Sequence, residues 1–269
     1  MNVGFLHPGL MGETLAANCS AVSLWAAQGR SQETRERADA HGLTEVADIE
    51  SMCSQSEMIV SICPPAAAVD VADQVAAAGF GGIYVDANAI SPQSARAIAT
   101  KFARYVDGSV IGPPAHAAGT TRLYLSGPQA DQVASLYAGS VLEARVIGDE
   151  PVAASALKMA YASWTKIGSA LHLAIRALAH AEGVEDALVN EWSLSQPWLG
   201  ERSERIAAGV GPKAWRFTGE MKQIAQAFAS IDAPTGFADA ANEIYERMAG
   251  FKGAPGPSLD AVIDAISQG

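Results

Sequence analysis

Cysteine is scarce in this sequence, and the three residues present form no pattern of disulfides or metal ligands. Cys19, Cys53 and Cys63 make no C-x-x-C pair and no cluster with histidine, which offers no zinc site and suits a reducing compartment. We expect their side chains to behave as small buried hydrophobes. The sequence thus predicts a fold that needs neither disulfides nor a structural metal.

Positive charge is also in short supply, since 18 Lys and Arg against 29 Asp and Glu give a net charge of -11. Such a protein repels phosphate backbones and anionic lipids, so a role on nucleic acid or on a membrane surface lacks its electrostatic basis. No apolar run approaches the ~18 residues of a membrane span. The first residues also lack the basic and apolar regions of a signal peptide. We therefore expect a cytoplasmic protein whose partner is a small-molecule substrate.

The first half of the chain alternates short apolar runs with helical patterns, which is typical of repeated βαβ units. The strands expected from this pattern cover residues 2–6, 21–25, 58–62, 82–86 and 105–109, with further candidates at 122–126 and 144–147. The pattern predicts an α/β fold, namely a Rossmann doubly wound parallel sheet. We assign residues 1–148 to this dinucleotide-binding domain.

After residue 148 the strand-like alternation ends, and we expect residues 149–269 to form an all-α C-terminal domain that binds substrate and dimerises. A long helix is expected over 151–182, with Pro151 at its first position. Shorter helices are expected over 185–192, 198–208, 215–231, 235–249 and 258–266, with a loop over 250–257. The long helix covers about thirty residues, well above the average helix length. It calls for packing partners, which a homodimer would supply.

The first expected strand leads into a turn typical of dinucleotide-binding folds. His7, Pro8, Gly9, Leu10, Met11 and Gly12 form this turn. Gly9 and Gly12 hold the second and third glycine positions of G-x-G-x-x-G, where the backbone approaches a pyrophosphate. His7 holds the first position, either as a turn residue that faces the cofactor or as a tolerated replacement. We expect the whole turn to bind the cofactor.

The end of the second strand indicates which nicotinamide cofactor is used. NAD-specific sites usually place an acidic residue there to bind the ribose 2′-hydroxyl, whereas this sequence has Arg30 and Ser31. A guanidinium and a hydroxyl at a helix start suit a 2′-phosphate, so we expect NADP (NADPH). The alternative is that Ser31 is a plain N-cap and Arg30 a solvated surface residue.

These segments resemble the superfamily of 3-hydroxyacid dehydrogenases and 6-phosphogluconate dehydrogenases, which includes imine reductases. The matching segments are 4–12 with 16–18, 61–65, 85–92, and 106–113 with 118–120. A narrower, poorly characterised phosphogluconate-dehydrogenase-like branch is resembled at 155–161 with 165–166, and at 214–221. The resemblance implies a Rossmann domain followed by a helical domain.

The resemblance also implies a role for individual residues. Cofactor contacts are implied for Cys63, Pro64, Pro65 and Asn88, and substrate contacts for Ser109 and Gly112. The family serine that binds the substrate's anionic group falls on Ile111, which has no donor, so Ser109 either donates instead or is a structural turn residue.

Lys158 matches the family's catalytic lysine near the start of the long helix, and the resemblance implies that it acts as general acid and base. It is one of six lysines in the chain, and Lys166 lies on the same otherwise apolar helix. The family asparagine four positions later is Ala162 here, so Tyr161 and Lys166 are alternatives for its role in binding substrate.

We therefore expect an NADP-dependent oxidoreductase that transfers a hydride between the nicotinamide and a small, acidic hydroxy or oxo compound. Imine reduction and a non-catalytic NADP sensor are the alternatives. Arg216 and Glu220, one helical turn apart, are expected to form a surface ion pair. The alternative is that Arg216, with Trp192 and Trp215, lines the substrate pocket and binds an anionic group.

Overall fold

The computed structural model describes residues 1–268 and divides the chain into two compact units, Met1–Met159 and the part from Ala160 onward. The division falls inside a helix, whereas the domain boundary predicted at residue 148 lies in the segment before that helix. Each unit is described by itself below.

The first unit is built on an eight-stranded sheet with the order β3-β2-β1-β4-β5-β6-β7-β8, and all neighbouring strands are parallel except β6 and β7. The strands are β1 Asn2–Phe5, β2 Val22–Ala26, β3 Thr44–Val46, β4 Met58–Ser61, β5 Ile83–Asp86, β6 Tyr105–Ile111, β7 Arg122–Ser126 and β8 Glu143–Val146. The predicted mainly parallel sheet is confirmed. The short edge strand β3 was missed because only Val46 is buried in it, so it shows no apolar run.

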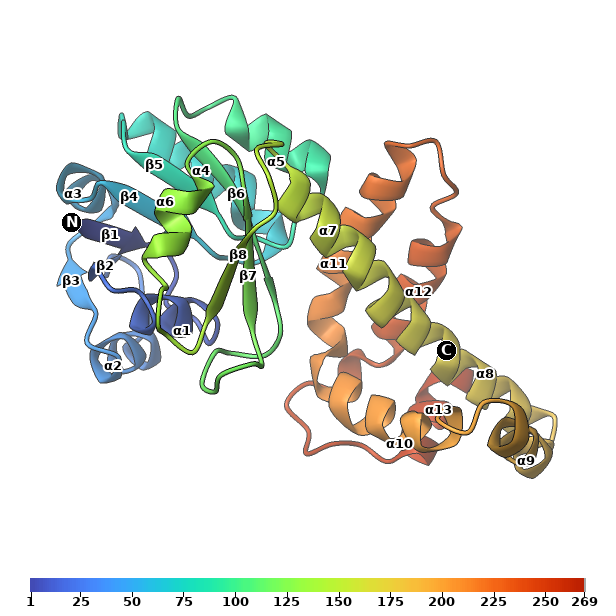
Figure 1. The fold of residues 1–269 in the computed structure, drawn as a ribbon. Helices are drawn as coiled ribbons and strands as arrows, with labels where there is room; N and C mark the ends of the chain where they lie inside the picture. The colour runs from blue at the N-terminus through green and yellow to red at the C-terminus, as the bar shows by residue number, and fades with distance from the viewer. Residues whose placement is uncertain (269) are drawn as a thin grey trace. The chain divides into compact units, whose positions relative to one another are not determined.

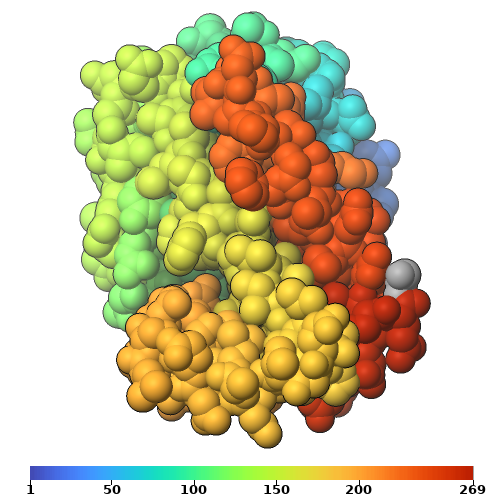
Figure 2. Space-filling view, turned by 90° about the vertical axis from the view of Figure 1, so that its right-hand side faces the viewer, coloured from blue at the N-terminus to red at the C-terminus, as the bar shows by residue number. Residues whose placement is uncertain are grey.

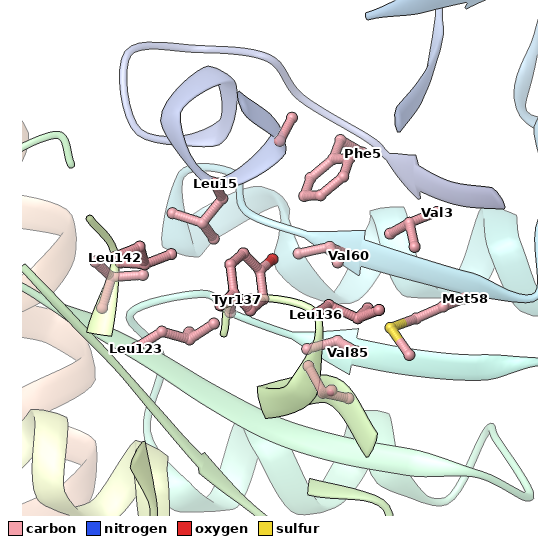
Figure 3. Packing of buried hydrophobic residues seen from close by; sticks show 14 of the residues in the cluster. Val3, Phe5, Leu15, Met58, Val60, Val85, Leu123, Leu136, Tyr137 and Leu142 are labelled. Atoms are coloured by element: carbon pink, nitrogen blue, oxygen red, sulfur yellow. The ribbon is translucent and has the colours of Figure 1, made fainter. Parts of the chain in front are cut away.

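Helices cover both faces of this sheet (Figure 1). They are α1 Gly12–Ala17, α2 Gln32–Ala40, α3 Ile49–Gln55, α4 Ala68–Ala77, α5 Pro92–Ala99 and α6 Ala130–Ser135. Neighbouring strand residues point to opposite faces, and accordingly Val85 joins one buried cluster and Tyr84 the other. Figure 3 shows the first cluster, in which Leu15 of α1 packs near Phe5 and Val60 of the strands. This two-sided arrangement confirms the doubly wound Rossmann fold.

The second unit is helical throughout. It begins with the last residues of α7 Ala153–Ala162, most of which belongs to the first unit, and continues with a π-helical stretch Ser163–Ile167 and α8 Gly168–Ala181. The remaining helices are α9 Glu185–Ser195, α10 Leu199–Val210, α11 Ala214–Ala229, α12 Gly236–Arg247 and α13 Leu259–Ser267. The predicted helices are confirmed with small shifts in their ends. Pro151 lies in a turn before α7 and not at a first helical position.

Leu173, Ile224, Tyr245 and Val262 are fully buried in this unit, and they come from four different helices. Packing of α8 against α10, α12 and α13, together with packing of α11 against α12, therefore supplies the core of the second unit. Within residues 1–268, no helix has the length and apolar character required to cross a membrane.

Candidate functional site

The turn between β1 and α1 is closed by its own main chain. Gly9 N donates to His7 O at 2.8 Å, and Glu13 N donates to Gly9 O at 2.9 Å. A Cβ at Gly12 would lie 2.1 Å from His7 O, so only glycine fits there. A Cβ at Gly9 would meet nothing within 4 Å, because this position faces open space. Gly12 therefore closes the turn, and Gly9 leaves its main chain accessible to a ligand, which is the arrangement that a pyrophosphate requires.

His7 takes the place of the first glycine with a largely buried ring whose Nδ1 has no hydrogen-bond partner among the described residues. Burial, together with the positive charge of Arg30, lowers the pKa of His7 to about 4. The imidazole is therefore neutral near pH 7 and adds no positive charge to the turn.

Arg30 lies against the end of β1, where its Nη2 donates to Leu6 O at 3.2 Å and its Nε is buried without a partner among residues 1–268. Arg30 is therefore partly buried. Ser31 is the N-cap of α2, because its Oγ accepts from Thr34 N at 3.3 Å. The capping alternative for Ser31 is thus realised, and its hydroxyl also lies 3.0 Å from the Thr34 hydroxyl.

Two other arginines near this turn are neutralised by carboxylates. Arg35 Nη1 lies 2.8 Å from Glu45, and Arg37 lies 3.0 Å from the buried Glu13 through its Nε. Arg30 has no carboxylate partner in the described part of the chain. It is therefore the cation of this group that is available to an anionic ligand.

Asn88 connects the loops that follow β4 and β5. Its Oδ1 accepts from Cys63 N at 2.6 Å, while its Nδ2 donates to Ser61 Oγ at 3.0 Å and to Asp86 Oδ1 at 2.7 Å. This buried amide fixes the start of the loop Cys63-Pro64-Pro65, in which Pro65 begins a 3-10 turn. Burial raises the pKa of Cys63 to about 12, so its thiol stays neutral. The loop is thus held at the carboxyl edge of the sheet, where ligands of such folds bind.

Lys158 lies on α7 with its Nζ 2.8 Å from the carbonyl oxygen of Val110, to which it donates. Val110 belongs to the carboxyl-terminal end of β6, which is parallel to β5. The structure therefore brings the candidate catalytic lysine to the sheet edge that also carries the β1–α1 turn and the Cys63 loop.

Ser109 and Gly112 lie close to Val110 in the chain, but both are held in closely packed surroundings. Ser109 is 1% exposed, and its hydroxyl has no partner among residues 1–268. Gly112 has φ 131°, and a Cβ there would lie 2.4 Å from Thr120 O. Gly112 is thus required by the close approach of the loop that ends at Thr120.

Tyr161 and Lys166 belong to the helical unit. Tyr161 is 48% exposed, whereas Lys166 Nζ lies 2.9 Å from Glu220 Oε2 and 4.9 Å from the centre of the Phe217 ring. Glu220 therefore pairs with Lys166, and the expected ion pair between Arg216 and Glu220 is wrong. The two partners are 54 positions apart and come from different helices, so local helical spacing could not reveal them.

Sequence reasoning missed two buried carboxyl groups, that of Asp86 at the end of β5 and that of Asp107 inside β6. Burial raises the pKa of Asp86 to about 6 and that of Asp107 to about 7. Among residues 1–268 no three His, Cys, Asp or Glu side chains gather into a group able to hold a metal ion.

Two family models match the chain. The NAD binding domain of 6-phosphogluconate dehydrogenase matches residues 2–144, and a domain of unknown function, DUF1932, matches residues 179–248. The first match covers the sheet up to the start of β8, with the turn, Arg30 and the Cys63 loop, and the second covers the end of α8 and all of α9 to α12.

Known relatives share this organisation. An uncharacterized 28.5 kDa protein of Methanothermus fervidus is 28% identical over 197 residues, which are 70% of this chain and 75% of the relative. The solved structure of MTH1747, a conserved protein of unknown function with structural similarity to 3-hydroxyacid dehydrogenases, is 26% identical with a TM-score of 0.73 over 93% of this chain and 98% of that one.

The structure of 3-hydroxyisobutyrate dehydrogenase from Mycobacterium tuberculosis gives a TM-score of 0.73 at 18% identity, over 98% of both chains. At this identity the likeness is one of fold. Together with the match over residues 2–144, it confirms the resemblance stated from the sequence. This chain belongs to the family defined by the NAD-binding domain of 6-phosphogluconate dehydrogenase, within the superfamily of the 3-hydroxyacid dehydrogenases.

Proposed function

We propose that this protein is an NADP-dependent oxidoreductase that transfers a hydride between the nicotinamide and a small, acidic hydroxy or oxo compound. The observation that carries the proposal is the position of Lys158, whose Nζ is held by Val110 O at the carboxyl edge of the sheet. The nicotinamide, when bound, supplies the hydride chemistry. The protein's own contribution is to bind and orient the cofactor and the substrate and to transfer the proton.

The residues of the β1–α1 turn fit the phosphates of such a cofactor. The accessible main chain at Gly9 and the glycine required at Gly12 support a pyrophosphate at residues 7–12. Arg30, without a carboxylate partner among residues 1–268, supports a 2′-phosphate and thus NADP. Ser31 contributes through its main chain and through the helix that it caps.

Lys158 moves the proton in this proposal. In oxidation its neutral Nζ accepts the proton of the substrate hydroxyl, and in reduction the ammonium returns that proton. The Val110 carbonyl keeps Nζ at the end of β6 and so orients it toward the substrate. Tyr161 and Lys166 are proposed substrate contacts of the helical unit, although Lys166 would have to serve while paired with Glu220.

The test is a combined binding and turnover experiment. Calorimetry should detect NADPH binding to the wild type. A panel of small 3-hydroxy acids, ketones and cyclic imines, followed at the nicotinamide absorbance, should identify a substrate. Imines belong in the panel because Ile111 offers no donor to a carboxylate. Lys158→Met should lower turnover roughly 10²–10⁴-fold, the usual worth of a general acid or base, with NADPH affinity unchanged.

Three results would contradict the proposal. Absence of NADP and NADPH binding by folded protein would remove the redox role altogether. Unchanged turnover in Lys158→Met would remove the lysine from the mechanism. Tight NADPH binding without turnover of any compound in the panel would favour the non-catalytic sensor.

Exposed apolar side chains on the helical unit support the proposal of a homodimer. Leu171 and Leu178 lie seven residues apart on α8 and are 59% and 63% exposed, and Trp164 just before them is 67% exposed. The space-filling view shows α8, in yellow, open at the surface of this unit (Figure 2). Exposed apolar side chains at this spacing are typical of a helix that packs against a second helix. We expect that helix to come from a second copy of the chain.

A further inference from the structure

A row of polar side chains crosses the sheet where apolar residues would be expected. Ser61, Asp86, Asp107 and Ser126 are partners in register on the neighbouring strands β4 to β7. All four are at most 1% exposed. Burial of carboxyl groups is costly unless hydrogen bonds compensate for the lost water. The row therefore needs a structural reason.

Asp86 accepts hydrogen bonds from Asn88 through its Oδ1, whereas Asp107 accepts hydrogen bonds from the beginning of α7. Its Oδ2 accepts from Ser155 N at 2.7 Å, and its Oδ1 accepts from Ser155 Oγ at 2.6 Å. Next to it, Ser126 Oγ accepts from Ala154 N at 3.1 Å. The first amides of a helix have no partner inside the helix. Here side chains of the sheet, and not the residue before the helix, accept from them.

The two attachments of α7 to β6 share one spacing. Ser155 and Lys158 are three residues apart on α7 and so lie on one side of the helix. Asp107 and Val110 are three residues apart on β6, and they hold Ser155 and Lys158 respectively. The helix is therefore fixed to the strand at two points, and the second point is the ammonium group of the lysine.

We propose that Asp107 is a positioning residue that anchors the first turn of α7 and thereby sets the place of Lys158 Nζ at the end of β6. The inference rests on the proposed function, because the position of Lys158 matters for the reaction only if Lys158 handles the proton. Asp107 itself is completely buried, so we expect it to act through Lys158 and not by contact with substrate or cofactor.

The experiment reads Lys158 directly and needs no substrate. The NMR spectrum of protein labelled with ¹³C at the lysine Cε contains six signals, one for each lysine of the chain. The quantity measured is the chemical shift of each signal. Lys158→Arg identifies the signal of Lys158. In the wild type the chemical shift of Lys158 should differ from those of exposed lysines. In Asp107→Ala this difference should fall to half or less, and in Asp107→Asn, which keeps one acceptor oxygen, it should fall by a smaller amount.

Asp48→Ala is the matched control. Asp48 also caps a helix of the first unit, because its Oδ1 accepts from Ser51 N at 2.8 Å, but that helix carries no lysine. Loss of either cap removes the acceptor of a helix N-terminal amide and should lower the urea midpoint of the fold. A role limited to stability would therefore affect the Lys158 signal equally in both variants, whereas positioning affects it only in Asp107→Ala.

An unchanged Lys158 signal in folded Asp107→Ala would overturn the inference. Should Asp107→Ala fail to fold, Ser155→Ala decides, since it removes the bond to Oδ1 and keeps the main-chain bond to Oδ2. A smaller displacement of the signal in Ser155→Ala supports the inference, and an unchanged signal overturns it. Failure of the proposed function gives a different result, namely a displaced signal in Asp107→Ala together with unchanged turnover in Lys158→Met.

Discussion

At the scale of single residues, Arg30 is where the choice between NADP and NAD is expected to lie. Its guanidinium is half-buried beside Leu6 O, and the neighbouring Arg35 is engaged by Glu45. We expect Arg30→Gln to weaken NADP binding about 10–100-fold, since a hydrogen bond to a charged group is worth about 1.5–3 kcal/mol. NAD, which has no 2′-phosphate, should bind with unchanged affinity. Calorimetry with both cofactors measures the difference.

Arg35→Gln is the control for this prediction, because its charge is already compensated and its loss should leave the preference for NADP unchanged. An equal loss of NADP and NAD affinity in Arg30→Gln would mean that Arg30 stabilises the turn and does not read the 2′-phosphate.

Gly9 and Gly12 form a second contrast between single residues in the same turn. Gly12→Ala places a Cβ 2.1 Å from His7 O, whereas Gly9→Ala meets nothing within 4 Å. We expect Gly12→Ala to lower the free energy of unfolding by about 1–3 kcal/mol, the usual cost of overpacking. Gly9→Ala should leave unfolding unchanged and weaken cofactor binding. Urea unfolding and calorimetry on both variants test this, and equal stability of the two would contradict the geometry.

At the scale of elements, the attachment of α7 to β6 predicts a pH dependence of stability. The pKa of Asp107 is raised to about 7, chiefly by burial and also by the charge of Asp86, while hydrogen bonds from Ser155 and Ser126 oppose the shift. In the unfolded chain an aspartate has a pKa of about 3.9. Between these values the folded state holds more protons than the unfolded state, so this contribution to stability falls as pH rises from about 4 to 7.

The ionisation of Asp107 should therefore lower the urea midpoint of the wild type between pH 5 and pH 8 relative to that of Asp107→Asn, which cannot ionise. Asp86 contributes with the same sign, because burial raises its pKa to about 6, whereas the lowered pKa of His7 contributes with the opposite sign. Both contributions persist in the variant, so the difference between the two proteins isolates Asp107. An identical pH dependence in both proteins would show that Asp107 does not titrate in this range.

At the scale of the whole molecule, the sequence predicts elements better than contacts between them. The apolar runs identify seven strands, because buried parallel strands are continuously apolar. They miss β3, where a single residue is buried. They also place polar residues such as Ser61 and Ser126 at strand ends, where they look like turn signals. That these residues line up with Asp86 and Asp107 depends on strand order and register, which only the fold provides.

The candidate site shows the same limit. The turn at residues 7–12 and Lys158 could be located from a local motif and a family resemblance. The inward position of Arg30 and the pairing of Lys166 with Glu220 depend on contacts between distant segments. Side-chain partners of this kind follow from packing and not from spacing along one helix.

The assembly of two chains is the remaining prediction at this scale. Light scattering on the wild type should give roughly twice the mass of one 27.9 kDa chain. Charged side chains at the exposed Leu171 and Leu178 would be buried without partners in the expected interface, which is strongly unfavourable. Leu171→Glu with Leu178→Glu should therefore give the mass of one chain with an unchanged circular dichroism spectrum. Leu194→Glu on α9, where Leu194 is 83% exposed, should leave the dimer intact. A wild-type mass of one chain would exclude the dimer, and loss of the dimer in Leu194→Glu would move the interface from α8 to α9.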